Sequence, residues 1–175
     1  TMYLLPEVNL KLLPRFVDEA RTLATADALS RMWKATGADG PAAAMRETEP
    51  GVFVYRFDWD EEPTKFTVDI SRLLGAAHGF EIPFVFGHWD LGSQTTLLFS
   101  AADEPGRLAL SKKMMGYWAA FARTGDPNGG GSDLPRWEPT VLPDGRFIVL
   151  DTEAGGGIRM ESGAVTREQA LAAVA

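Results

Sequence analysis

The fold class is most clearly indicated by the stretch Val52-Phe53-Val54-Tyr55-Arg56-Phe57-Asp58-Trp59. It is nearly continuously apolar, β-branched or aromatic, which is typical of a strand buried on both faces. Because side chains alternate along a strand, Phe53, Tyr55, Phe57 and Trp59 share one side of it. Such a strand normally lies in a parallel sheet covered by helices, so the sequence predicts an α/β protein.

The region before this strand, residues 1–50, is predicted to be a helical region made of several helices separated by turns. Apolar residues recur at helical spacing over 16–24, and Thr25 can cap a second helix, which Gly37 would end.

After the strand, the pattern predicts a long helix that opens at Asp103 and stops at Gly125, a strand over 146–150 and a closing helix over 167–174. The closing helix begins with a capping box formed by Thr166 and Gln169. The long helix carries one apolar stripe: Leu110, Met114, Tyr117, Trp118 and Phe121. Two predicted strands are too few for an independent sheet with both faces covered, so the residues indicate a segment of a larger α/β protein.

Composition excludes several classes of function. The chain has 175 residues, 45% of them apolar, which is enough for one domain with a core. A net charge of −7 argues against nucleic acid or an anionic membrane surface as a partner, and no apolar run is long enough to span a membrane. Cysteine is absent, which permits a cytoplasmic location without requiring it and excludes thiolate chemistry. With two histidines, a multi-histidine metal site is not expected. No cofactor is expected either.

His78 is the residue best suited to catalysis. It lies in a loop after the buried strand, and the small residues on both sides give its imidazole room to approach another group. A histidine has an unperturbed pKa near 6.5, which suits proton transfer at neutral pH. On these grounds alone a structural role for His78 remains an open alternative.

The stretch that surrounds this histidine is distinctive. Gly75-Ala76-Ala77-His78-Gly79-Phe80-Glu81-Ile82-Pro83-Phe84-Val85-Phe86-Gly87 resembles the catalytic-histidine segment of the type B carboxylesterase and cholinesterase family. Three further landmarks continue the resemblance in the same order: the helix with the run 117–128, the segment Trp137-Glu138-Pro139, and a strand leading to the run 150–153. The resemblance covers about 52–153, and the two longer motifs together are specific.

The resemblance implies an α/β-hydrolase in which serine, acid and histidine follow one another along the sequence. Residues 1–175 would then be a C-terminal segment of one such domain, with 1–50 helical and 51–175 holding the last sheet strands, the catalytic-histidine loop and the closing helices. His78 would be the last member of the triad. Glu81 is a candidate for orienting the histidine loop, with a plain structural role as the alternative. Substrate-pocket candidates, with core packing as the alternative, are Phe80, Phe84 and Trp89.

Two members of the triad have no match in this chain. None of its seven serines lies in Gly-x-Ser-x-Gly, and no glutamate lies in the context expected of the triad acid. We expect the serine, the oxyanion hole and the acid in the remainder of the esterase, upstream of Thr1. A local acid at Asp58 or Asp60 is a weaker alternative, because the acidic run 58–62 also has the pattern of a solvated face. His88 is expected to be a loop residue, and the three glycines at 155–157 are expected to form a turn.

The sequence therefore predicts part of a serine carboxylesterase that acts on a small-molecule ester only together with its remainder. The alternative is a non-catalytic, cholinesterase-like binding or adhesion module, or an inactive fragment. A Gly-x-Ser-x-Gly segment upstream would favour the enzyme.

Overall fold

The computed structural model describes residues 8–9, 15–16, 18–130, 134–141 and 143–172. The last residues of the predicted closing helix, 173–174, lie outside this set, as do most of the first 17 residues of the chain.

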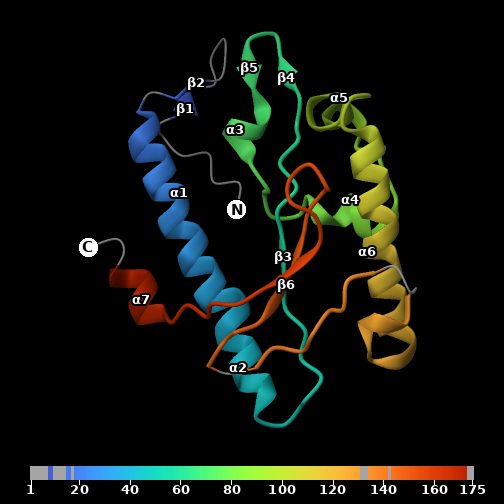
Figure 1. Cartoon of the computed structure of the whole chain (residues 1–175). Coiled ribbons are helices and arrows are strands. Elements are labelled where there is room, and N and C mark those ends of the chain that lie inside the picture. The colour runs from blue at the N-terminus through green and yellow to red at the C-terminus, as the bar shows by residue number, and fades with distance from the viewer. Residues whose placement is uncertain (1–7, 10–14, 17, 131–133, 142, 173–175) are drawn as a thin grey trace.

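A three-stranded sheet lies at the centre of the described residues (Figure 1). Its order is β3 (Tyr55–Phe57), β6 (Phe147–Leu150) and β7 (Arg159–Glu161), with β3 parallel and β7 antiparallel to β6. The parallel pair aligns Tyr55 with Ile148, as expected for strands of an α/β protein. Both predicted strands are thus present, although β3 is shorter than the apolar stretch that indicated it.

The prediction that this strand is buried on both faces was wrong. The aromatic residues do share one side, where Phe53, Tyr55 and Phe57 pack against Phe121, Trp118 and Phe84, respectively, but 39% of Tyr55 is exposed. The other side carries Arg56, which is exposed and paired with Asp58 and Glu161. The strand is therefore half-buried, and the polar residues at alternate positions are its solvent face.

The core lies between the sheet and two helices, α4 (Glu81–Phe86) and α6 (Glu104–Thr124). Every residue of β6 is buried, and α6 turns Leu110, Met114 and Tyr117 of the predicted stripe inward, whereas Trp118 is only partly buried and 47% of Phe121 is exposed. The helix ends where predicted, because Gly125 adopts a left-handed conformation with φ of 73° that an L side chain rarely takes.

The N-terminal region is helical in part. Helix α1 (Glu19–Trp33), a π-helix (Lys34–Asp39) and α2 (Gly40–Arg46) follow one another without a break, and in Figure 1 this rod lies on the opposite side of the β3–β6 pair from α6. The predicted helix boundary at Thr25 and the stop at Gly37 were therefore wrong. The Thr25 hydroxyl instead bonds the carbonyl of Arg21 in the preceding turn, so the residue sits inside a helix without capping one.

Short strands also fall inside the region predicted to be helical. β1 (Val8–Asn9) and β2 (Arg15–Phe16) pair with each other in antiparallel fashion. The closing helix, α7 (Arg167–Ala172), begins with the predicted capping box, in which Gln169 N–H donates to the Thr166 hydroxyl at 3.2 Å and the Gln169 side chain accepts in return from Thr166 N–H at 2.8 Å.

Short elements make up the connections around the core. They are β4 (Thr64–Lys65), β5 (Val68–Asp69), α3 (Ile70–Leu74), a 3₁₀ turn (Gly92–Gln94), α5 (Thr95–Leu98) and a second 3₁₀ turn (Pro127–Gly130). Among the described residues, no helix has the length and apolar character needed to cross a membrane.

Candidate functional site

His78 lies in the turn that connects α3 to α4. Helix α3 ends at Gly75, and a short turn closed by a hydrogen bond from Phe80 N–H to Ala77 O leads into α4. Ala77 is buried beneath the turn, whereas the His78 side chain is exposed. Gly79 has φ of 92°, so a residue with a side chain at this position would be strained.

Glu81 ties this turn to the helix that follows it. Its carboxylate oxygen Oε2 accepts a hydrogen bond of 2.8 Å from the main-chain N–H of Gly79, the residue next to His78. Glu81 is the first residue of α4, where the helix dipole favours a negative charge. The arrangement lets Glu81 hold the backbone that carries His78, without touching the imidazole itself.

The residue that meets the imidazole is one that the sequence analysis did not single out. The indole ring of Trp33, at the end of α1, lies against the His78 ring with centroids 5.2 Å apart and planes tilted by 54°. No motif near His78 could have indicated this contact, because it joins two elements that are remote in sequence.

The three pocket candidates have different environments. Phe84 is fully buried and packs against Phe57, Trp59 and Trp89, which favours the packing role that was the alternative for it. Phe80 and Trp89 are partly buried against the same core. Trp89 also stacks with the guanidinium group of Arg107 at 4.3 Å from the ring centroid. As expected, His88 lies in the loop after α4, and it is exposed.

No serine hydroxyl or carboxylate of the described residues forms a hydrogen bond or ion pair with the His78 imidazole. Neither local alternative for the acid is bonded to the imidazole within the described residues: Asp58 accepts hydrogen bonds of 2.7 and 2.6 Å from Arg56 on the solvent face of β3, and Asp60 is exposed. The described part of the chain thus offers a histidine without a nucleophile and without an acid.

The acidic run 58–62 is not uniformly a solvated face. Glu62 is 5% exposed, and neither of its carboxylate oxygens has a hydrogen-bond partner among the described residues. Burial raises the pKa of Glu62 to about 7, and the nearby charges of Asp60, Glu61 and Asp103 contribute to this rise. The expectation of solvation was therefore wrong for Glu62, whose carboxylate is buried in the folded chain.

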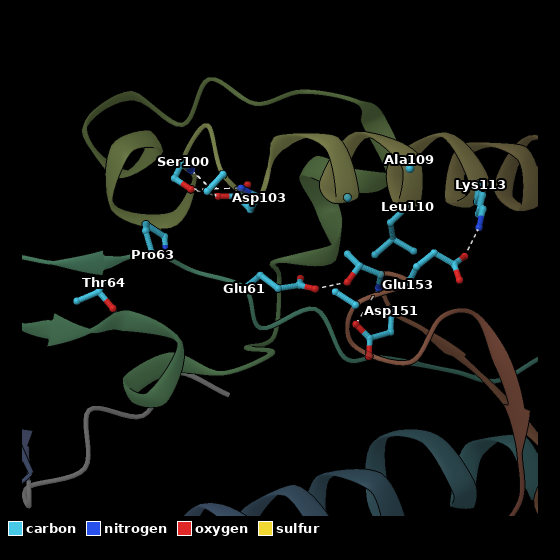
Figure 2. A pocket seen from close by; sticks show the side chains of 14 residues that line it. Glu61, Pro63, Thr64, Ser100, Asp103, Ala109, Leu110, Lys113, Asp151 and Glu153 are labelled. Carbon is cyan, nitrogen blue, oxygen red and sulfur yellow. Dashed lines mark hydrogen bonds and ion pairs between the residues drawn. The ribbon is translucent and has the colours of Figure 1, made fainter.

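A cavity of about 630 Å³ lies between the segment after β3, the first half of α6 and the turn that follows β6 (Figure 2). Its lining combines Leu110 and Ala109 of α6 with four carboxylates, those of Glu61, Asp103, Asp151 and Glu153. Glu61 hydrogen-bonds Thr152 across one side, and Lys113 pairs with Glu153 at 2.8 Å on another. His78 does not line this cavity, so it is not the space in which the histidine would act.

The glycines at 155–157 form a turn, as predicted. The N–H groups of Gly155 and Gly157 both donate to the carbonyl of Thr152, at 3.1 and 2.7 Å. This turn connects β6 to β7. Among the described residues, no cluster of acidic or histidine side chains has the arrangement needed to hold a metal ion.

Comparison with known proteins gives a consistent result. The Carboxylesterase family profile matches residues 14–170. Carboxylesterase 5A of Mus musculus is 37% identical over 122 residues, which are 70% of this chain and 20% of that protein. Carboxylesterase 4A of Bos taurus is 39% identical over 109 residues, and acetylcholinesterase of Gallus gallus is 34% identical over 123 residues.

Solved structures of esterases are similar as well. A carboxylesterase of Geobacillus stearothermophilus matches with a TM-score of 0.50 and 30% identity, covering 78% of this chain and 24% of that one. A PNB esterase matches with a TM-score of 0.51 and 30% identity, covering 69% of this chain and 21% of the esterase. The described residues thus form a partial α/β-hydrolase fold, and the chain spans about a fifth of the length of the curated relatives it matches.

Proposed function

The chain belongs to the carboxylesterase family, and from this premise we propose that it is a C-terminal part of a serine carboxylesterase in which His78 is the general base. The single observation that carries the proposal is the exposed imidazole of His78, held between small residues on a turn that Glu81 ties to α4. The imidazole is free to approach a group that the described residues do not supply.

In the proposed reaction, His78 takes the proton of a serine hydroxyl as the serine oxygen attacks the ester carbonyl. The imidazolium then returns this proton to the departing alcohol. Water then attacks the acyl-enzyme and gives up a proton to His78. As the bond between the acyl carbon and the serine oxygen breaks, the imidazolium returns this proton to the serine oxygen, which releases the carboxylic acid and regenerates the serine and neutral His78. The serine, the oxyanion hole and the acid partner of His78 belong, in this proposal, to the remainder of the esterase.

Substitution of His78 in the complete esterase tests its assignment. We expect His78→Ala to lower kcat/KM for a short acyl ester by at least about 10³-fold, as the loss of one triad member does in comparable enzymes. His88→Gln is the matched control, because His88 is an exposed loop residue ten positions along the same segment, and it should keep full activity. Wild-type turnover by the His78→Ala enzyme would refute the role of His78 as general base.

The competing proposal is a binding module without hydrolytic activity. The two proposals differ in one measurement, the reaction of the complete protein with a fluorophosphonate probe that labels activated serines. We expect labelling, and we expect it to be strongly reduced in His78→Ala, because the histidine activates the serine. A protein that stays unlabelled while it is folded would favour the binding module.

A further inference from the structure

Trp33 makes a contact between two parts of the chain that are far apart in sequence. It ends α1, in the N-terminal helical region, yet its indole ring packs against His78 in the turn before α4. Its side chain is not part of the core, because 49% of Trp33 is exposed. The contact with His78 is therefore made by a tryptophan that lies partly in solvent and not in the core.

The helical segment that follows Trp33 along the chain has an unusual local structure. Its residues, Lys34–Asp39, form a π-helix, a rare conformation that recurs at functional sites. Within it, Gly37 lies directly under the indole, and a Cβ atom at Gly37 would lie 3.5 Å from the Cε2 atom of Trp33. The ring therefore rests on a backbone without a side chain, which supports its position against His78.

The imidazole of His78 has few other restraints. Within the described residues the imidazole makes no hydrogen bond or ion pair, and its one ring contact is with Trp33. Small errors in the orientation of a catalytic group cost a large factor in rate, because the barrier depends on alignment of the reacting atoms.

We propose that Trp33 is a positioning residue for His78: its indole ring holds the imidazole in the orientation needed for proton transfer and shields one side of it from water. This inference rests on the proposed role of His78 as general base. In this inference, helix α1 of the N-terminal region contributes one side chain, Trp33, to the site.

The test compares Trp33→Ala and Trp33→Phe with Leu29→Ala in the complete esterase. Leu29 is the matched control, since it lies on the same helix and is 40% exposed. We expect Trp33→Ala to lower kcat about 10-fold or more with KM changed less than about 2-fold, because the lost interaction acts on proton transfer and not on substrate binding. Trp33→Phe, which keeps an aromatic ring, should recover most of kcat, and Leu29→Ala should match the wild type.

A second readout does not depend on activity. In histidine-labelled protein, with His78→Gln used to assign the signal, the imidazole resonances of His78 should move in Trp33→Ala because the ring current of the indole is lost, while those of His88 stay in place. An unchanged His78 signal, or a rise in KM with kcat unchanged, would overturn the positioning role. Activity retained by His78→Ala would refute the proposed function instead, and the resonances would still show whether the two rings are in contact.

Discussion

The side-chain hydroxyl group of Ser111 donates a hydrogen bond of 2.7 Å to the main-chain carbonyl oxygen of Phe84. Ser111 is on α6 and Phe84 is on α4, and both are buried. The last carbonyl groups of a helix have no partner within that helix, so this hydroxyl satisfies an oxygen that burial would otherwise leave unpaired. The bond thereby fixes α4, and with it the turn that carries His78, against the long helix.

We expect Ser111→Ala to lower the free energy of unfolding by about 1–3 kcal/mol, because it leaves the Phe84 carbonyl buried without a partner. Urea unfolding followed by circular dichroism measures this change. Ser30→Ala is the control, since Ser30 is an exposed serine on a helix, and it should change stability by less than about 0.5 kcal/mol. Equal stability of the two variants would contradict a structural role for this bond.

A buried ion pair lies at the start of the same helix. The Arg107 guanidinium donates a hydrogen bond of 2.7 Å to Asp103, and both side chains are less than a tenth exposed. The Arg107 plane also stacks on Trp89 and Phe99. We expect Arg107→Ala to destabilise the protein by about 3–5 kcal/mol, because it leaves the Asp103 charge buried without its partner.

Thermal unfolding of three variants separates the contributions to this pair. Arg107→Lys keeps the charge but loses the planar stacking, so its Tm should fall between those of the wild type and Arg107→Ala. Arg31→Ala removes an arginine whose pair with Asp27 is solvent-exposed, and its Tm should stay close to that of the wild type. A Tm for Arg107→Lys equal to that of the wild type would show that stacking contributes nothing.

Local signals in the sequence predicted the elements that local interactions specify. The long helix has an apolar stripe and a glycine at its end, and the closing helix has reciprocal hydrogen bonds between Thr166 and Gln169. The half-burial of β3 could also have been predicted, because Arg56 and Asp58 occupy alternate positions in the apolar stretch.

Features that depend on distant segments were not predicted. Strand β7 reads Arg-Met-Glu and has no apolar pattern of its own; it is a strand because it pairs with β6. The contact of Trp33 with His78 and the burial of Glu62 likewise depend on which segments the fold brings together. The residues adjacent in sequence do not indicate such contacts, so they are seen only in the three-dimensional structure.

Glu62 makes the stability of the protein depend on pH. Its pKa is raised from 4.5 in the unfolded chain to about 7 in the folded protein, chiefly by burial. The folded state therefore binds more protons than the unfolded state around these values, so the free energy of unfolding falls as pH rises through the range from about 5 to 8 and is level above it. The loss is at most about 3.5 kcal/mol, because a tenfold change in a proton-binding constant corresponds to about 1.4 kcal/mol.

We expect Glu62→Gln to remove this dependence, because glutamine stays uncharged at every pH. Relative to the wild type, the variant should gain stability progressively between about pH 5 and pH 8, as measured by urea unfolding at fixed ionic strength. Glu47→Gln, at an exposed position of the chain, should show the pH dependence of the wild type. A constant difference between wild type and Glu62→Gln across this range would contradict the assigned cause.

The outer edge of β3 is free within the described residues, because β6 is its only neighbour there. The carbonyl of Val54 and the N–H of Asp58 bond to β6, each at 3.0 Å. Main-chain groups of alternate residues in a parallel strand point to the same side, so those of Tyr55 and Phe57 point to the free edge. An unpaired edge of this kind is a template for another strand, and the remainder of the esterase is its proposed partner.

We therefore expect the 175-residue chain alone to self-associate and to lack esterase activity. Light scattering after gel filtration should give a mass above the monomer for the wild type and for Tyr55→Ala, which loses the ring but keeps the N–H. Tyr55→Pro also removes the N–H that faces the free edge, while the bonds of Val54 and Asp58 to β6 remain, so it should associate much less than Tyr55→Ala at the same concentration. A wild-type chain that is strictly monomeric, or ester hydrolysis by this chain alone, would contradict the proposal that it is one part of a larger catalytic domain.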